Sequence, residues 1–193
     1  MLRIAVESDV PAILDIYGPY IVTSTATFEY TVPSREEFLE RFHSITARFP
    51  WLVYEEVGVI LGYAYASAPF TRAAYAWCAE PSVYLRPDAR GRGVGRQLYA
   101  GLEAILKYQG FQLLYALVTG ENTASLSFHR ALGYETIAVF PDCGFKFGRW
   151  LDLNWLQKRL TAVEIPSAPP SAWAEIRQDA QKLSDILGIL SLS

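Results

Sequence analysis

The first part of the chain alternates apolar runs with polar segments in a pattern typical of short strands and amphipathic helices. Residues 2–6 predict a strand, and Asp9 with Pro11 marks the start of a helix that runs to about residue 20. Residues 23–34 are rich in Thr and Ser and predict a loop. The chain therefore begins as a strand, a helix and a polar connection.

A second helix and a hairpin are predicted next. Ser34 and Glu37 form a capping box, and apolar residues follow it at helical spacing, namely Phe38, Leu39, Phe42 and Ile45. Two runs rich in branched and aromatic residues, 51–57 and 59–67, flank Gly58 and predict the two strands of the hairpin.

The second half predicts strands alternating with helices. A strand at residues 82–85 ends at a glycine-rich loop, which opens a helix with one apolar face. Residues 113–119 predict a strand of the kind buried in a parallel pairing, and Asn122 caps a helix that Gly133 ends. Residues 135–157 supply the last strands. This order of elements predicts an α/β fold with one mixed sheet.

The composition changes after residue 163. A proline-rich hinge (IPSAPPS) separates an expected domain at 1–163 from a tail at 164–193, whose apolar residues follow helical spacing: Trp173, Ile176, Ala180, Leu183, Leu187 and Leu190. We expect an amphipathic helix that packs back onto the domain or onto a second subunit. Membrane contact is the alternative, although the basic face that membranes favour is absent.

Composition restricts the class of protein. Of the 193 residues 51% are hydrophobic and 19% charged, which excludes a disordered chain, and no apolar run reaches the roughly 18 residues of a membrane span. Cys78 and Cys143 are too few for a disulfide framework, so we expect two buried thiols and a cytoplasmic protein. The net charge of -3 disfavours a general nucleic-acid binder.

Residues 86–96 form a locally positive segment in this acidic chain, because they include four arginines and one aspartate. The glycines of this segment do not match the dinucleotide pattern GxGxxG or a P-loop, and leave RxxGxG with Arg90, Gly93 and Gly95. A strand, this loop and a helix start in that order favour an anion site built from backbone N–H groups. An ordinary glycine-rich turn with solvated arginines is the alternative.

Four blocks in order carry a family resemblance: IVTSTATFEY, AEPSVYLRPDARGRGVG, SFHRALGY and GFKFGRWLDL. Together they resemble the GNAT acetyltransferases, and within them the phosphinothricin and methionine sulfoximine N-acetyltransferases. The resemblance covers residues 2 to about 160. It implies a central, mostly antiparallel twisted sheet flanked by helices, and transfer of an acetyl group from acetyl-CoA to an amine without a metal.

The resemblance assigns roles to individual residues. Glu80 would be the general base, with a solvated strand-end charge as the alternative. His129 stands where many GNAT enzymes have a tyrosine, so it would act as the acid for the leaving thiolate, position the cosubstrate, or be structural. Contacts to acetyl-CoA would come from Val83, Tyr84, Leu85, Arg90, Gly91, Arg92, Gly93, Val94, Gly95, Arg96, Asn122 and Ser125.

Acceptor binding would fall to the loops, at Phe28, Arg72 and Tyr75. Arg72 could hold a carboxylate or phosphinate, or face solvent. We therefore expect an enzyme, a homodimer, that acetylates the α-amine of small amino-acid-like acceptors in a ternary complex, without nucleic acid or membrane. The rivals are acetylation of peptide N-termini, polyamines or aminoglycosides, and a non-catalytic acyl-CoA-binding module.

Overall fold

A computed structural model describes residues 1–162, 165–166 and 168–191, without the side chains of 180 and 189–191. Seven strands form one sheet in the order β1-β2-β3-β4-β5-β7-β6. Only β4 and β5 pair in parallel, and the other neighbours are antiparallel, as expected. The strands are β1 (Leu2–Ile4), β2 (Trp51–Glu56), β3 (Val59–Ser67), β4 (Cys78–Leu85), β5 (Leu113–Thr119), β6 (Glu135–Lys146) and β7 (Arg149–Arg159).

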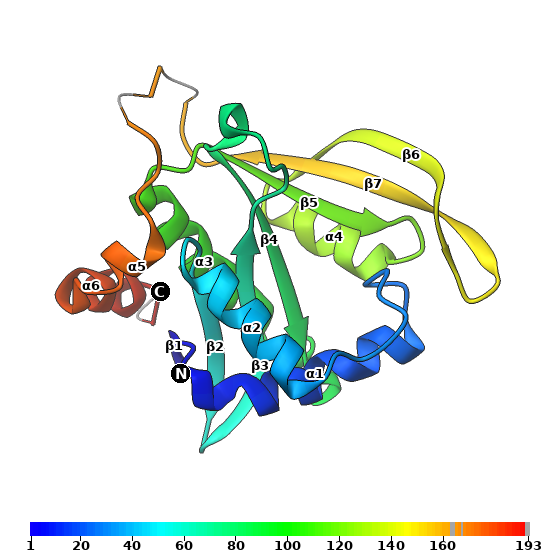
Figure 1. The fold of residues 1–193 in the computed structure, drawn as a ribbon, viewed down its shortest axis with the longest axis horizontal. Helices are drawn as coiled ribbons and strands as arrows, with labels where there is room; N and C mark the ends of the chain where they lie inside the picture. The colour runs from blue at the N-terminus through cyan, green and yellow to red at the C-terminus, as the bar shows by residue number, and fades with distance from the viewer. Residues whose placement is uncertain (163–164, 167, 192–193) are drawn as a thin grey trace.

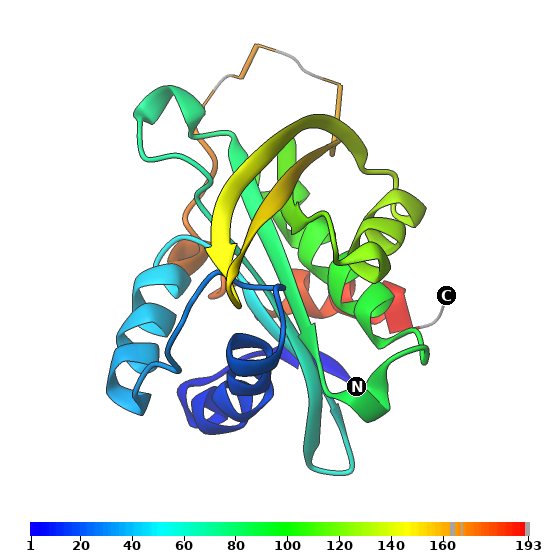
Figure 2. The ribbon, with the colours of Figure 1, turned by 90° about the vertical axis from the view of Figure 1, so that its right-hand side faces the viewer.

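Helices cover both faces of the sheet (Figures 1 and 2). Two lie on one face, α1 (Val10–Thr23) and α2 (Arg35–Thr46), and two on the other, α3 (Val94–Gln109) and α4 (Thr123–Ala131). Short 3-10 turns span Glu7–Asp9, Ala73–Tyr75 and Pro87–Ala89. The capping box is confirmed, because the Ser34 hydroxyl accepts from the Glu37 N–H at 3.1 Å and Glu37 accepts from the Ser34 N–H at 2.7 Å.

Each face of the sheet has its own hydrophobic core. Under α1 and α2 lies an aromatic cluster centred on Trp51, which stacks on Tyr65 with ring centroids 4.4 Å apart. Under α3 and α4 the core is mainly aliphatic and includes Leu98, Leu102 and Ile105, all fully buried. The apolar residues at helical spacing after the glycine loop therefore form the buried face of α3.

The tail packs back onto the domain, as expected. It forms α5 (Trp173–Ile176) and α6 (Ala180–Ser191), and α6 lies against α3 and β1. Trp173 and Leu183 are buried in the same core as α3. Residues 163–164, where the domain was expected to end, and the side chains of Ala180 and Leu190 lie outside the part that the structure describes.

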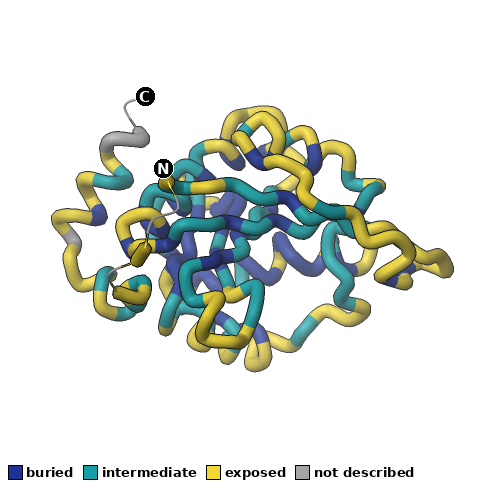
Figure 3. Tube along the Cα trace, turned by 90° about the horizontal axis from the view of Figure 1, so that it is seen from above, coloured by how far each residue is buried: buried dark blue, intermediate teal, exposed yellow. Residues whose placement is uncertain are grey.

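Two expectations need correction. Helix α1 continues to Thr23 in spite of Pro19, because a proline disturbs the turn before it and leaves the N–H groups after it free to bond within the helix. Cys143 is exposed rather than buried, since it lies in an irregular part of β6, the edge strand, most of whose residues are exposed (Figure 3). Cys78, in β4, is buried as expected.

The parallel pairing of β4 with β5 is short. Only Cys78 and Ala79 face partners on β5, Leu113 and Leu114. Beyond them β4 runs on to Leu85 and the two strands diverge, which leaves a fork in the middle of the sheet (Figure 1).

Candidate active site in the fork of the sheet

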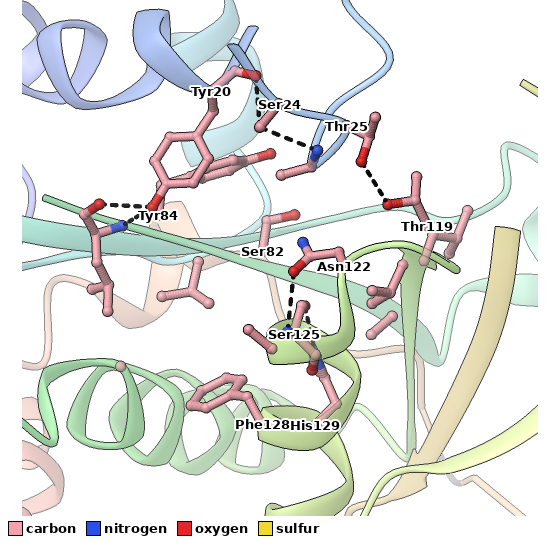
Figure 4. A pocket seen from close by; sticks show the side chains of 18 of the residues that line it. Tyr20, Ser24, Thr25, Ser82, Tyr84, Thr119, Asn122, Ser125, Phe128 and His129 are labelled. Carbon is pink, nitrogen blue, oxygen red and sulfur yellow. Dashed lines mark hydrogen bonds between the residues drawn. The ribbon is translucent and has the colours of Figure 1, made fainter. Parts of the chain in front are cut away.

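A cavity of about 650 Å³ fills this fork. Its walls are the diverging parts of β4 (residues 80–85) and β5 (116–119), the first turns of α3 and α4, and the loop after α1. The residues that line it therefore come from segments far apart in the sequence, and Figure 4 shows those from α1, the loop after it, β4, β5 and α4. Ten residues expected at the site line it: Glu80, Val83, Tyr84, Leu85, Arg90, Gly91, Gly95, Asn122, Ser125 and His129.

The glycine loop ends at the start of α3. Gly91 and Gly93 have φ of 73° and 80°, a left-handed conformation that glycine adopts without strain. Gly93 is the N-cap of α3, so the first N–H groups of the helix lie next to the arginines of the loop. Helix dipole, backbone donors and cationic side chains thus converge at one end of the cavity, as an anion requires.

Gly95 keeps the mouth of the fork open. A Cβ atom placed there would lie 3.4 Å from both the Leu85 side chain and the Phe128 ring, so a larger residue would narrow the gap between β4 and α4. Four expected loop residues do not line the described cavity: Arg92, Gly93, Val94 and Arg96. Val94 is buried in the core, Arg96 is exposed, Arg92 pairs with Glu56 at 2.6 Å, and Gly93 is the exposed N-cap of α3.

The edge of β4 presents backbone groups to the fork. The Pro81 carbonyl oxygen lies 3.2 Å from the Tyr99 hydroxyl oxygen, and the Leu85 carbonyl accepts from the Tyr20 hydroxyl at 2.7 Å. Both carbonyls therefore point away from β3. Every second residue of a strand directs its N–H and C=O groups to the same side. Val83, which lies between Pro81 and Leu85 in this series, therefore presents both groups to the fork as well. An extended ligand with amide groups could pair with this edge.

Glu80 lies where β4 and β5 begin to diverge. It is the first residue of β4 beyond the parallel pairing, and it lines the cavity. Burial raises the pKa of Glu80 to about 7, because the charged carboxylate loses solvation. A carboxyl group with a pKa near neutrality can take up a proton and release it again at physiological pH.

His129 is buried and contacts protein at both ring nitrogens. Nδ1 lies 2.8 Å from the Ser125 carbonyl oxygen, and Nε2 lies 2.8 Å from the Tyr99 hydroxyl. Burial lowers the pKa of His129, which favours the neutral ring. Since a carbonyl can only accept, Nδ1 carries the proton of the neutral ring and Nε2 accepts from Tyr99.

The N-terminus of α4 forms the wall opposite β4. The Asn122 side chain accepts from the Ser125 N–H at 3.1 Å, so it caps the helix as the sequence indicates. Its amide group remains in the lining of the cavity, where Figure 4 shows it between Ser82 and Ser125. One residue thus orders the helix and offers polar atoms to a ligand.

The three residues expected to bind the acceptor lie outside the described lining of the cavity. Phe28 is half-buried against Gly144 of β6. Arg72 and Tyr75 are exposed just before β4, where the Tyr75 ring lies 4.4 Å from that of Phe70. Arg149 lines the mouth instead, in a two-point ion pair with Glu121 at 2.7 and 2.9 Å.

The lining residues that were not foreseen include four with hydroxyl groups that form hydrogen bonds: Tyr20, Thr25, Tyr99 and Thr119. The Tyr20 hydroxyl bonds both backbone groups of Leu85 and accepts from Arg90 at 3.1 Å. The hydroxyls of Thr25 and Thr119 are 3.2 Å apart. Tyr99 follows the glycine loop by one helical turn, and that spacing was the only signal in the sequence that could have indicated it.

Comparison with known proteins decides the family. The model of the acetyltransferase (GNAT) domain matches residues 2–155. The chain belongs to the GNAT acetyltransferases. It is thus an acetyltransferase, as the sequence predicts.

Similar GNAT proteins include two enzymes with stated acceptors. The chain is 42% identical to a phosphinothricin N-acetyltransferase of Alcaligenes faecalis over 83% of each chain. It is 37% identical to the L-methionine sulfoximine/L-methionine sulfone acetyltransferase of Pseudomonas aeruginosa PAO1, over 87% of this chain and 98% of that one. A solved GNAT phosphinothricin acetyltransferase from Sinorhizobium meliloti, in complex with AcCoA, superposes with a TM-score of 0.84 at 38% identity, over 90% and 97% of the two chains.

The fork in this GNAT chain fits the cosubstrate expected from the sequence. Its glycine loop and helix start suit a pyrophosphate, its open β4 edge suits an amide-containing arm, and Glu80 lies at the inner end. Among the described residues no helix is long and apolar enough to cross a membrane. Nor does that part of the chain bring three or more His, Cys, Asp or Glu side chains together as a metal site.

Proposed function

We propose that this enzyme acetylates the α-amine of small amino-acid-like acceptors, of the phosphinothricin, methionine sulfoximine or methionine sulfone type, by direct transfer in a ternary complex. Bound acetyl-CoA supplies the acetyl group as a thioester. The observation that carries the proposal is the position of Glu80, a carboxyl group with a pKa near 7 at the inner end of a fork whose other end is suited to an anion. The names of the relatives support the class of acceptor.

In this mechanism Glu80 removes a proton from the acceptor amine, and the β4 edge orients the thioester carbonyl group. Glu80 accepts the proton of the acceptor's ammonium group, which frees the nitrogen lone pair to attack the thioester carbon. The Val83 N–H on the β4 edge donates to the carbonyl oxygen as negative charge develops there. Attack forms the C–N bond. The C–S bond then breaks, and the second proton of the attacking nitrogen passes to the departing thiolate, so that an amide and a free thiol are released.

His129 acts in this scheme as a positioning residue. The single N–H of its neutral ring is engaged by the Ser125 carbonyl, so the ring has no free proton for the thiolate. Its Nε2 instead fixes the Tyr99 hydroxyl, which lines the cavity. The geometry supports this role over direct acid catalysis, and the pH profile of His129→Gln, given in the Discussion, distinguishes the two.

The acceptor panel tests the substrate class. Free-thiol release should be fastest with methionine sulfoximine, methionine sulfone or phosphinothricin, and near background with spermidine, aminoglycosides and peptides. We propose that Arg72, an exposed cation before β4, holds the acceptor's acidic group. Arg72→Ala should then raise the KM for the amino acids more than it lowers kcat, because a clamp on a non-reacting group contributes mostly uniform binding.

The outcomes of the panel separate the rival functions. Faster turnover of spermidine or a peptide would overturn the acceptor class and leave the acetyltransferase in place. Acetyl-CoA binding without turnover of any amine would favour the non-catalytic acyl-CoA-binding module. An Arg72→Ala variant with an unchanged KM would remove Arg72 from the site.

We further propose a homodimer that forms through the edge strand β6. Large apolar side chains are exposed on β6, the hairpin tip and the start of β7: Ile137, Val139, Phe140, Phe145, Phe147 and Trp150. An exposed apolar edge strand of this kind tends to associate. Light scattering should give twice the mass of one chain, and Val139→Lys should shift it towards one. A single-chain mass at all concentrations would contradict the dimer.

We place the enzyme in the cytoplasm. The two cysteines are free thiols, and one of them, Cys143, is exposed, which suits a reducing compartment. Fractionation of expressing cells checks this, since activity confined to an oxidising compartment would contradict it.

A further inference from the structure

Lys146 is an unusual residue of β6. Most of this strand is exposed, yet Lys146 is only 2% exposed. Its ammonium group donates to two backbone carbonyls of the loop after α1, at 2.9 Å to Ser24 and 2.6 Å to Thr27. Burial lowers the pKa of Lys146, because these neutral acceptors replace only part of its hydration. Burying a cation in this way is costly, so its contacts need an explanation.

The two residues before Lys146 contact the same loop. Phe28 packs on Gly144 so closely that an added Cβ atom at Gly144 would lie 2.4 Å from its ring. The Tyr30 hydroxyl donates to the Phe145 carbonyl. Three consecutive residues of β6, 144–146, therefore hold the segment 24–30 at several points. They belong to the block GFKFGRWLDL, in which the family resemblance assigns no role to an individual residue.

The loop that these contacts hold is a wall of the cavity. Ser24, Thr25 and Ala26 line it, on the side facing the N-terminus of α4 (Figure 4). Thr25 also reaches β5 through its hydrogen bond with Thr119. Its side chain is buried, so its position depends on how the loop backbone is placed.

The other face of the loop has its own anchor. Glu29 accepts from the Tyr17 hydroxyl at 2.9 Å and from Arg41 at 2.7 Å. This ion pair joins the loop to α2. Within residues 24–27, the Ser24 and Thr27 side chains bond to α1, at 2.8 Å to the Tyr20 carbonyl and 2.9 Å to the Tyr17 hydroxyl, while the Ser24 and Thr27 carbonyls are held from β6 by Lys146. The contacts of Lys146 are thus the polar link between β6 and the part of the loop that lines the cavity.

We propose that Lys146 is a positioning residue for the acceptor: its ammonium group ties the loop 24–27 to β6 and so sets the wall against which the amine substrate is held. This rests on the proposed function. The anion-binding end of the cavity is built from other segments, the glycine loop and α3, and does not depend on this link. Loss of the link should therefore weaken acceptor binding and spare acetyl-CoA.

The test compares Lys146→Met with Lys146→Arg and with Lys158→Met. Lys158 is a partly buried lysine of β7 that pairs with Glu103 at 2.5 Å, outside the lining of the cavity. Lys146→Met should raise the acceptor KM at least about tenfold and leave the acetyl-CoA Kd within about twofold. Lys146→Arg should recover part of the loss, because it keeps a cation with several donors. Lys158→Met should lower the melting temperature without changing either constant.

A second variant covers the case in which Lys146→Met does not fold. Gly144→Ala keeps the ammonium group but displaces Phe28, and it should produce the same split between the two substrates. A folded Lys146→Met with the wild-type acceptor KM, or an equal loss of acetyl-CoA affinity, would overturn the proposal, and so would Gly144→Ala with unchanged constants. If the wild-type enzyme acetylates no amino acid, the proposed function fails, and the same comparison with the amine that it does acetylate still tests Lys146.

Discussion

Glu80→Gln should lower kcat by about 10² or more at neutral pH and leave the acetyl-CoA Kd almost unchanged. The amide keeps the shape of the side chain but cannot accept the ammonium proton. In the wild type, kcat/KM should rise as the pH passes through about 7, the pKa to which burial raises Glu80, because only the deprotonated carboxylate is a base. Stopped-flow or thiol-release assays between pH 5.5 and 9 measure this profile.

The same variant should be more stable than the wild type at alkaline pH. The folded-state pKa of Glu80, about 7, lies above the ordinary 4.5, so the unfolded chain ionises first and the wild type loses stability as the pH rises between these values. Glu80→Gln has no ionisation and avoids the loss, roughly 3 kcal/mol at pH 8. The gap in melting temperature should close below about pH 4.5.

Two further variants make the Glu80 result specific. Glu103→Gln alters a carboxylate that accepts from Lys158 and Tyr134 away from the cavity, so it should reduce stability and spare kcat. If His129 is the general acid, the wild-type rate should fall on the alkaline side of the pH profile, and His129→Gln should remove that fall. If His129 only positions Tyr99, the alkaline side of the profile should have the same shape in His129→Gln as in the wild type. Loss of acetyl-CoA binding in step with the rate of Glu80→Gln would make Glu80 structural.

Gly93→Val should raise the acetyl-CoA Kd at least about tenfold, roughly 1.4 kcal/mol. Gly93 has φ of 80° at the N-cap of α3, and a β-branched residue is strained there, so the backbone N–H groups of the anion site would shift. Isothermal calorimetry on the folded variant measures the effect.

Gly58→Val is the matched control for this change. Gly58 has φ of 76° in the turn between β2 and β3 and, like Gly93, has nothing within 4 Å of an added Cβ atom. It should carry a similar strain penalty and bind acetyl-CoA normally. Equal affinities of Gly93→Val and the wild type would remove the glycine loop as the anion site.

The local features of the site were predictable from the sequence because they depend on neighbouring residues. The glycines of the loop, the cap at Asn122 and the strand before the loop each follow from short-range rules, and the structure has all three. Glu80 and His129 came from the family resemblance. Their roles stay predictions, but both residues line the cavity.

The remainder of the site depends on contacts between distant residues, which spacing alone does not reveal. Tyr20 and Leu85 are 65 residues apart, and Lys146 lies 122 residues from Ser24. The point at which β4 leaves β5 is a property of the whole sheet. Sequence patterns indicate which residues form a strand, but not where its partner diverges.

The fork also makes the stability of the folded chain depend on the concentration of acetyl-CoA. A ligand that binds only the folded state stabilises it by an amount that grows with its concentration, about 2.7 kcal/mol at one hundred times its Kd. Here the groups with which a ligand would pair are backbone groups at the centre of the sheet rather than on a loop, since the pairing of β4 with β5 ends at Ala79. Chains in cells rich in acetyl-CoA should therefore resist heat and proteolysis better than the same chains in starved cells.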